Sequence, residues 1–111
     1  MEAVPQLGQF EQLVLTAILA LQDDAYGVTI HARVAALSEP RSVSIGAVYV
    51  TLERLEQKGL VSSWLSEPTA TRGGRAKRCF RLEAAGERAL RDSARAIRRL
   101  HDALTAAWGR A

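Results

Sequence analysis

The chain has 111 residues and is 48% hydrophobic, so it is long enough for one domain with a modest core and too apolar to remain disordered. Its formal net charge is +3, and 13 of its 15 basic residues are arginines, whose planar guanidinium groups suit contacts with phosphates and guanine. The single cysteine excludes an internal disulfide and offers no zinc cluster, and no apolar run predicts a signal peptide or a membrane span. We therefore expect a cytoplasmic protein without a metal or another cofactor.

Two helices are predicted in the first third of the chain. Apolar residues recur at helical spacing between Gln9 and Leu21, on nearly every side of that helix, which indicates burial on more than one face. After the polar break at residues 22–24, a second helix is expected over residues 25–37. Its apolar residues are Tyr26, Val28, Ile30, Val34 and Leu37. A turn follows, because Pro40 biases the residue before it away from helical backbone angles.

A third helix and a β-hairpin come next. The helix is expected to start at the N-cap Ser44 and to end at Gly59. Its inward stripe is formed by Val48, Leu52 and Leu55. Residues 60–65 resemble a strand, residues 68–74 a loop and residues 76–82 the return strand. Alternation on the return strand places Phe80 and Leu82 on one face, and Lys77, Cys79 and Arg81 on the other. Cys79 is interpreted as a half-buried strand residue, with a redox role as the alternative.

The last segment, about residues 83–110, predicts one long helix with an apolar seam. The residues of the seam are spaced 4, 3, 4, 3 and 4 positions apart: Leu90, Ala94, Ile97, His101, Leu104 and Trp108. A helix of about 25 residues is roughly 37 Å long, too long to be covered by the rest of so short a chain. We expect it to pair with the same helix of a second copy across a two-fold axis. The alternative is a helix folded back on its own domain.

The most basic part of the chain lies in the expected hairpin. Five of the ten residues from Arg72 to Arg81 are cationic, and they bracket a Gly-Gly turn. A helix followed by a basic β-hairpin is the layout of a winged helix-turn-helix, which places its helix in the major groove of DNA and its hairpin at the flank. The sequence thus predicts a mainly α fold with a small β-hairpin wing: a winged helix-turn-helix plus a long C-terminal dimerisation helix.

Four motifs, in this order, resemble the PadR family of bacterial transcriptional regulators. They are the first helix (residues 7–15), the Tyr-Gly opening of the second (24–28), the recognition helix with its exit (44–61), and the wing with the start of the last helix (73–82 and 85–86). Cys79 departs from the family, which often has an aromatic residue there. The single C-terminal helix resembles the short PadR subfamily.

The resemblance implies a homodimeric repressor that binds a pseudo-palindromic DNA operator and is released by an effector or another signal. It also implies two domains, a DNA-binding domain over residues 1–83 and a dimerisation helix over residues 84–111. A small-molecule effector is one candidate for that signal, and the sequence identifies neither the molecule nor its chemical class.

The expected DNA contacts lie on helix 44–58, which would enter the major groove, and on the wing, residues 66–78. On the helix they are Ser44, Gly46, Ala47, Tyr49, Thr51 and Arg54, with Thr51 and Arg54 expected to be exposed. On the wing they are Arg72, Arg75, Lys77 and Arg78. Other interpretations stay open: Tyr49 packs against the wing, Ser44 is an N-cap alone, Gly46 and Ala47 pack on the second helix, Arg54 pairs with glutamates, and the wing is merely solvated.

The two tryptophans are candidates for an effector pocket. In some PadR-like proteins the dimer interface forms an apolar cavity for flat ligands, and Trp64 and Trp108 could line one here. The simpler interpretation makes Trp108 an anchor of the seam and Trp64 a strand residue near the core. His101 would make the dimer sensitive to pH, or would be a satisfied interface histidine.

An enzyme is not expected. The two histidines, His31 and His101, lie seventy positions apart, and the sequence contains neither a nucleophile motif nor a phosphate-binding loop. The alternative to a transcription factor is a winged-helix module that binds proteins without specific DNA binding. The cationic wing favours DNA.

Overall fold

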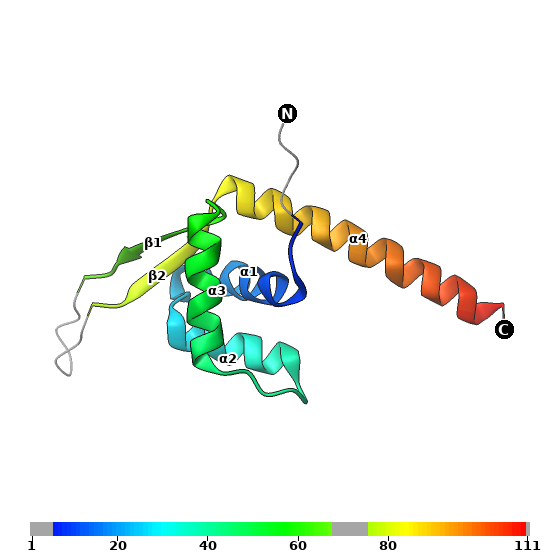
Figure 1. Ribbon diagram of the computed structural model, residues 1–111, viewed down its shortest axis with the longest axis horizontal. Coiled ribbons are helices and arrows are strands. Elements are labelled where there is room, and N and C mark those ends of the chain that lie inside the picture. Colours follow the sequence, from blue (N-terminus) through cyan, green and yellow to red (C-terminus); the bar gives the residue numbers. More distant parts are fainter. Residues whose placement is uncertain (1–5, 68–75, 111) are drawn as a thin grey trace.

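The computed structural model describes residues 6–67 and 76–110, which are mainly helical with one two-stranded antiparallel sheet (Figure 1). In chain order the elements are α1 (Gln9–Leu21), the 3₁₀ turn η1 (Gln22–Asp24), α2 (Gly27–Ser38), α3 (Ile45–Gln57), β1 (Val61–Leu65), β2 (Arg78–Leu82) and α4 (Ala84–Gly109). This order of elements confirms the predicted winged helix-turn-helix, which consists of three helices and a hairpin, followed by a long C-terminal helix. The expected loop at 68–74 lies outside the described residues.

Helix α1 lies at the centre of the fold and has its predicted bounds. The helices α2, α3 and α4 and the strand β2 all contact it. Val14, Leu15 and Ala17 are all fully buried although they lie at different angles around the helix, which turns by about 100° per residue. Their burial confirms that α1 is covered on more than one side.

The core takes side chains from every α-helix and from both strands. Besides those of α1, its buried residues include Ile30, Val34, Val48, Leu52, Leu55, Leu60, Val61, Phe80 and Ala89. The inward stripe predicted for α3 is therefore confirmed. Two of the apolar residues predicted for the second helix point to solvent instead, since Val28 is 60% exposed and Leu37 is 50% exposed.

The second helix begins two residues later than predicted, because Ala25 and Tyr26 pair with β2. The backbone N–H of Phe80 donates to the carbonyl oxygen of Ala25 at 2.9 Å, and Tyr26 forms an antiparallel bridge with Cys79. These two residues thus pair with the free edge of β2 through an isolated bridge. They also cover Cys79, which is 8% exposed rather than half-buried.

Both ends of α3 are fixed by the residues that the sequence indicated. The Oγ of Ser44 accepts a hydrogen bond from the N–H of Ala47 at 3.1 Å, which caps the first turn. At the other end Gly59 has φ of 75°, its N–H donates to the carbonyl of Glu56, and the N–H of Leu60 donates to the carbonyl of Leu55, both at 3.0 Å. This pair of bonds is a Schellman motif, which a glycine at this position favours.

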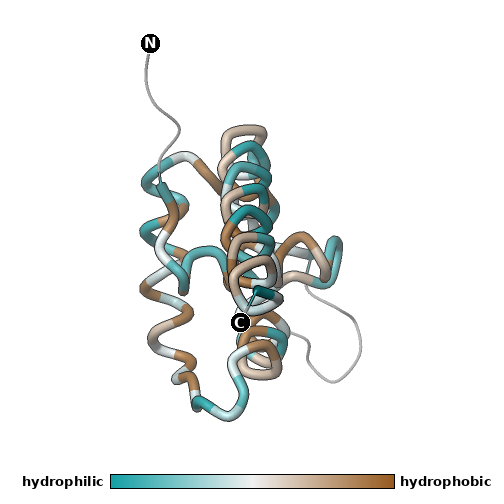
Figure 2. The backbone as a smooth tube through the Cα atoms, turned by 90° about the vertical axis from the view of Figure 1, so that its right-hand side faces the viewer, coloured by the Kyte–Doolittle hydropathy of each residue, from teal (hydrophilic) through white to brown (hydrophobic). Residues whose placement is uncertain are grey.

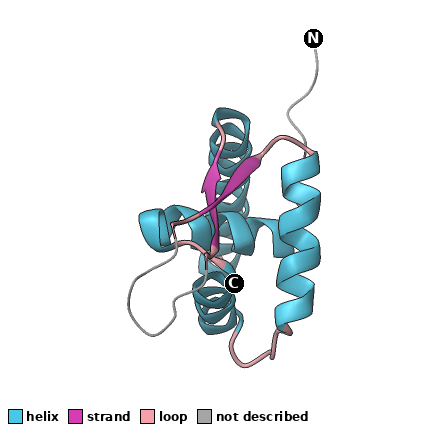
Figure 3. Cartoon of the chain, turned by 90° about the vertical axis from the view of Figure 1, so that its left-hand side faces the viewer, coloured by secondary structure: helices cyan, strands magenta, loops and turns pink. Residues whose placement is uncertain are grey.

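The hairpin follows α3 directly and lies beside it (Figure 3). Its antiparallel register runs from Val61 opposite Leu82 to Leu65 opposite Arg78. Phe80 and Leu82 pack toward the core as predicted, with Phe80 buried and Leu82 partly buried, while Arg81 is exposed. The hairpin is thus anchored by apolar side chains at the end nearest α3 and α4.

Helix α4 has 26 residues and leaves the body of the protein after its first turns (Figure 1). Ala89 is buried and Leu90 packs on the core. Farther along, large apolar side chains are exposed: Ile97, Leu100, Leu104 and Trp108. Figure 2 shows hydrophobic and hydrophilic segments alternating along this helix, as a helix with one apolar face requires. Within the described ranges, no helix has the length and apolar character needed to cross a membrane.

The start of α4 packs closely against Leu60, just after the end of α3, at Gly86. The N–H of Glu83 donates to the carbonyl oxygen of Leu60 at 2.9 Å, and a Cβ on Gly86 would collide with that same oxygen. We expect Gly86→Ala to lower the free energy of unfolding by about 1–3 kcal/mol, because backbone must shift to make room.

The matched control is Gly46→Ala, where a Cβ would have no atom within 4 Å. This substitution should leave stability unchanged or raise it by about 0.5–1 kcal/mol, since alanine favours helix over glycine. Denaturant unfolding of both variants at equal protein concentration measures the difference. Equal effects of the two substitutions would contradict the close approach at Gly86.

Candidate nucleic-acid interface

The N-terminal half of α3 is open to solvent. Among the predicted contacts, Ser44, Gly46, Ala47, Tyr49 and Arg54 are all exposed. The turn before the helix is tied to α2, because the Nε2 of His31 lies 2.7 Å from the carbonyl oxygen of Val43 and a proton on Nε2 donates to it. Arg54 forms no ion pair within the part of the chain that the structure describes.

Thr51 corrects one expectation. It was expected to be exposed, but it is 7% exposed. It stands three residues after Val48 and four before Leu55, so it falls on the buried stripe of the helix. Its hydroxyl is a polar group at an inward position, and the spacing of the stripe, rather than the polarity of the residue, decides where it points.

Five exposed residues of α3 were missing from the predicted contacts, and three of them share one face of the helix; the five are Ile45, Val50, Glu53, Glu56 and Gln57. Val50, Glu53 and Gln57 stand four, seven and eleven residues after Gly46, which is the spacing of one helix face. Val50 is 50% exposed, and Glu53 and Gln57 are also exposed. The helical period that identified the buried stripe could have identified this face as well.

Tyr49 lies against the first residue of α2. A Cβ on Gly27 would collide with the hydroxyl and the ring of Tyr49, so the two residues meet only because residue 27 is a glycine. Tyr49 is nonetheless 49% exposed. This contact places Tyr49 against α2, and packing on the wing stays a prediction. The tyrosine hydroxyl is therefore held at a helix N-terminus, where unpaired backbone N–H groups carry partial positive charge.

Lys77 joins the same surface from the hairpin. Its Nζ lies 4.2 Å from the centroid of the Tyr26 ring, a cation–π contact. Its backbone is fixed as well, since Ser66 and Lys77 exchange hydrogen bonds: the Lys77 N–H donates to the Ser66 Oγ at 3.0 Å, and the Ser66 N–H donates to the Lys77 carbonyl at 2.8 Å. Tyr49 and Lys77 thus both lie next to the start of α2, one at Gly27 and the other at Tyr26, and we call this group the border beside α3.

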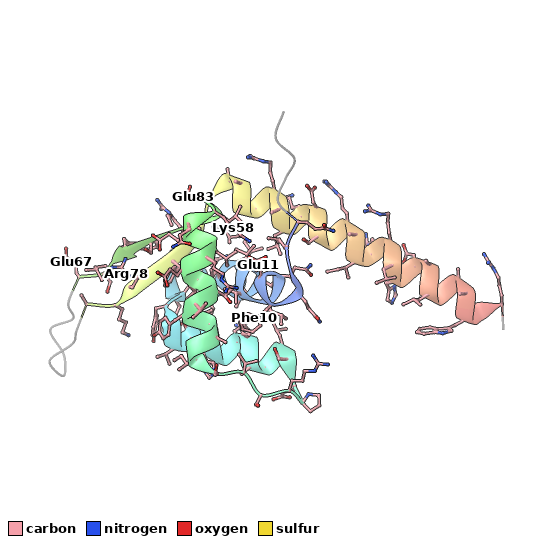
Figure 4. The ribbon with its side chains drawn as sticks, in the orientation of Figure 1. Phe10, Glu11, Lys58, Glu67, Arg78 and Glu83 are labelled. Carbon is pink, nitrogen blue, oxygen red and sulfur yellow. The ribbon has the colours of Figure 1, made fainter. Side chains whose placement is uncertain are left out.

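The other wing residues divide into two groups. Arg78 points back toward α3, because its Nη1 donates to the Oγ of Ser63 at 3.0 Å and that hydroxyl donates to Oε2 of Glu56 at 2.7 Å. Figure 4 shows Arg78 on the hairpin beside Glu67. Arg72 and Arg75, and with them the Gly-Gly turn, lie outside the described residues.

Comparison with known proteins decides the family. A model of the transcriptional regulator PadR-like family matches residues 14–92. The chain belongs to the PadR-like family. Among the curated proteins none matches the sequence.

Solved structures agree with this family. A PadR family transcription regulator from Clostridium difficile R20291 is 26% identical, with a TM-score of 0.73 over 88% of this chain and 96% of that protein. A PadR-like transcriptional regulator from Bacillus cereus shares the fold at 16% identity, with a TM-score of 0.72 over 88% and 89% of the two chains. Bacillus subtilis PadR, solved in complex with operator DNA, shares it at 17% identity, with a TM-score of 0.61 over 74% and 44%.

An ion pair links the far end of α3 to α1 in this PadR-like protein (Figure 4). The Nζ of Lys58 donates to Oε2 of Glu11 at 2.6 Å, while the N–H of Gly8 donates to Oε1 at 2.9 Å. Burial would raise the pKa of Glu11, but the bonds from Lys58 and Gly8, with the charges of Lys58 and Arg54, outweigh it. The pKa of Glu11 is therefore below its ordinary value.

The predicted seam residues of α4 differ in their surroundings. Leu90 packs on the core of its own chain. The others are exposed in the single chain: Ala94, Ile97, His101, Leu104 and Trp108. Ile97 also lines a hollow of about 450 Å³ with Leu7 and Gln12 of its own chain, whereas Leu104 and Trp108 lie outside that hollow.

The two tryptophans are not brought together within one chain. Trp64 lies on β1, where the Arg81 guanidinium stands 5.4 Å from its ring centroid, beside a hollow of about 280 Å³ that Leu19 and Leu82 also line. Trp108 lies near the C-terminal end of α4, at the opposite end of the molecule from the hairpin (Figure 1). A shared pocket would have to be formed with a second chain.

The close contact between Tyr49 and Gly27 leads to a testable prediction. Gly27→Ala should push the Tyr49 ring aside with a loss of no more than about 1 kcal/mol of stability, because the atoms it displaces are the end of a mobile side chain. NMR shifts of the Tyr49 ring protons, together with denaturant unfolding, measure both effects. A loss as large as that of Gly86→Ala would contradict this account.

The Glu11–Lys58 pair predicts a pH dependence of stability. Because the folded-state pKa of Glu11 is lowered, its contribution is present above the unfolded-state pKa of about 4.5 and is lost as the pH falls through the lower folded-state pKa. Glu11→Gln should cost up to about 1 kcal/mol at pH 7 and flatten the stability profile between pH 5 and 3. Urea unfolding across that range tests it, with the exposed Glu53→Gln as control. A profile for Glu11→Gln as steep as that of the unaltered protein would refute it.

Proposed function

We propose that this PadR-like protein is a sequence-specific DNA-binding repressor that acts in the cytoplasm as a homodimer on a pseudo-palindromic operator. Helix 44–58 enters the major groove, and the wing, residues 66–78, lies along the flank. The observation that carries the proposal is the exposed N-terminal half of α3, bordered by Tyr49 and Lys77. A family member, Bacillus subtilis PadR, has been solved with operator DNA, which supports the same use of the fold here.

The border beside α3 suits phosphate oxygens. The Tyr49 hydroxyl can donate a hydrogen bond, the first N–H groups of α2 carry partial positive charge, and the Lys77 ammonium group carries a full one. Contacts of this kind set the position of a protein on DNA without reading its sequence. Ser44 adds one more hydroxyl at the start of α3, although its oxygen already accepts from Ala47. Arg72 and Arg75 stay predicted wing contacts.

The homodimer is proposed from the uncovered face of α4. Ile97, Leu104 and Trp108 are 54%, 41% and 71% exposed, and their spacing places them on one side of the helix. Arg88, Arg95 and Arg99 occupy the opposite side, and Arg91 and Arg98 lie between the two sides. A helix with this division of side chains buries its apolar face against a partner, and a second copy supplies an identical face across a two-fold axis.

Gel-shift titration against DNA from upstream of the protein's own gene tests the function. We expect a discrete complex that survives competitor DNA and that weakens by about 10³–10⁵ between 50 and 200 mM salt if the dimer neutralises roughly 6–10 phosphates. Lys77→Ala should make the salt dependence shallower by about two units of slope per dimer. Arg99→Ala, which removes the same charge from α4, should leave the slope unchanged.

Other outcomes of the titration are equally informative. Selective binding that is found only in a pool of random DNA sequences would keep the function and place the operator elsewhere. Binding to no DNA even at low salt would overturn the function in favour of a module that binds proteins.

The dimer is tested separately. Ile97→Asp and Leu104→Asp should yield monomers, because a buried carboxylate without a partner costs several kcal/mol. Arg99→Asp, on the polar side of the same helix, should remain dimeric. Sedimentation velocity measures the state, and circular dichroism checks that the monomers keep their helices. Dimers that persist in both seam variants would contradict the proposed interface.

A further inference from the structure

The base-reading part of α3 is defined by the residues that point away from the core. Gly46, Val50, Glu53 and Gln57 form this outer face. Within residues 6–67 and 76–110, neither the Glu53 carboxylate nor the Gln57 amide has a side-chain hydrogen bond or an ion pair. They are chemically free at the centre of the surface that the proposed function turns toward DNA.

The outer face carries no cation. The basic residues of this region lie on other sides: Arg54 is at the margin of the helix, Lys58 is paired with Glu11, and Lys77 and Arg78 belong to the hairpin. A carboxylate at the centre of the face is repelled by phosphates, so Glu53 is not a backbone contact. Base edges are the groups in the major groove that a valine and a carboxylate match.

The side chains of Val50 and Glu53 each match one base edge. The branched methyl groups of Val50 can pack on the C5-methyl group of thymine, which is the apolar group that the major groove presents. The Glu53 carboxylate accepts hydrogen bonds and so matches the N4 amino group of cytosine. Gly46, one turn earlier, has open space where a Cβ would stand, which permits the helix backbone to come close to the groove.

The spacing of the two side chains matches that of neighbouring base pairs. Val50 and Glu53 are three residues apart, which is about 4.5 Å along a helix axis, against about 3.4 Å between base pairs on one strand. We propose, resting on the DNA-binding function above, that Val50 and Glu53 set the base preference of this protein, with Val50 reading a thymine methyl group and Glu53 reading a cytosine amino group at an adjacent position of each half-site.

The first experiment selects binding sites from random DNA with the unaltered protein, Val50→Ala and Glu53→Gln. The unaltered protein should select half-sites with a thymine next to a cytosine. Glu53→Gln should lose the cytosine and favour adenine, because an amide pairs with the N6 and N7 of adenine. Asp102→Asn, which makes the same charge change on α4, should select the same sites as the unaltered protein.

The second experiment removes the thymine methyl group alone. Replacing the selected thymine by deoxyuridine should weaken the unaltered protein about fourfold per half-site, the effect of one buried methyl group. Val50→Ala should not distinguish the two bases, so the side chain and the methyl group are coupled in a double-mutant cycle. Both substituted residues are exposed, so unfolding midpoints should match that of the unaltered protein.

Failure of the inference and failure of the function have different signatures. If the unaltered protein selects no motif, the proposed function itself fails. If it selects a motif but Val50→Ala responds to deoxyuridine as strongly as the unaltered protein does, or Glu53→Gln keeps the cytosine, the DNA-binding function stands and this assignment of base contacts is overturned.

Discussion

The burial of α1 is the constraint on which the other elements depend. Its fully buried residues include neighbours such as Val14 and Leu15, so packing partners are needed on more than one side, and α2, α3, β2 and α4 supply them. An apolar helix of this kind cannot remain exposed in water, and each partner contributes a stripe of its own to cover it. The outward faces of those partners are therefore left for polar and functional side chains, and α3 presents its outer face for this reason.

Several short hydrogen bonds at both ends of α3 hold the helix in place. Ser44 caps its first turn, His31 holds the carbonyl just before it, and the Schellman motif at Gly59 closes its last turn. The Lys58–Glu11 pair adds a partly exposed bond to α1, of the kind that contributes less than about 1 kcal/mol but fixes direction. The proposed reading of base edges by α3 depends on such fixed placement, because hydrogen bonds to bases tolerate little error in distance.

Local signals in the sequence predicted the elements that local forces decide. The bounds of α1, the cap at Ser44 and the stop at Gly59 follow from helical spacing and from residues within one turn of each end. The start of α2 could not be predicted in this way, because Ala25 and Tyr26 pair with residues more than fifty positions away. The polarity of the threonine side chain predicts exposure for Thr51, but its spacing from Val48 and Leu55 places it on the buried stripe. The contact of Tyr49 with Gly27 is purely tertiary. The exposed seam of α4 was predictable, because a long helix with a heptad pattern exceeds what one small core can cover.

The close backbone contact at Gly86 fixes the start of α4 relative to the end of α3. The same Leu60 whose N–H closes α3 also offers its carbonyl to the start of α4, and no side chain separates the two backbones there. Helix α4, about 39 Å long, is thus a rigid arm that is joined to the end of α3. In a dimer paired through α4, a tilt of about 5° between the two arms moves their ends by about 3 Å, close to the rise of one base pair. In the proposed dimer, the angle at which two copies cross would set the operator spacing that they can span, and a ligand that altered that angle would govern DNA binding without contacting α3.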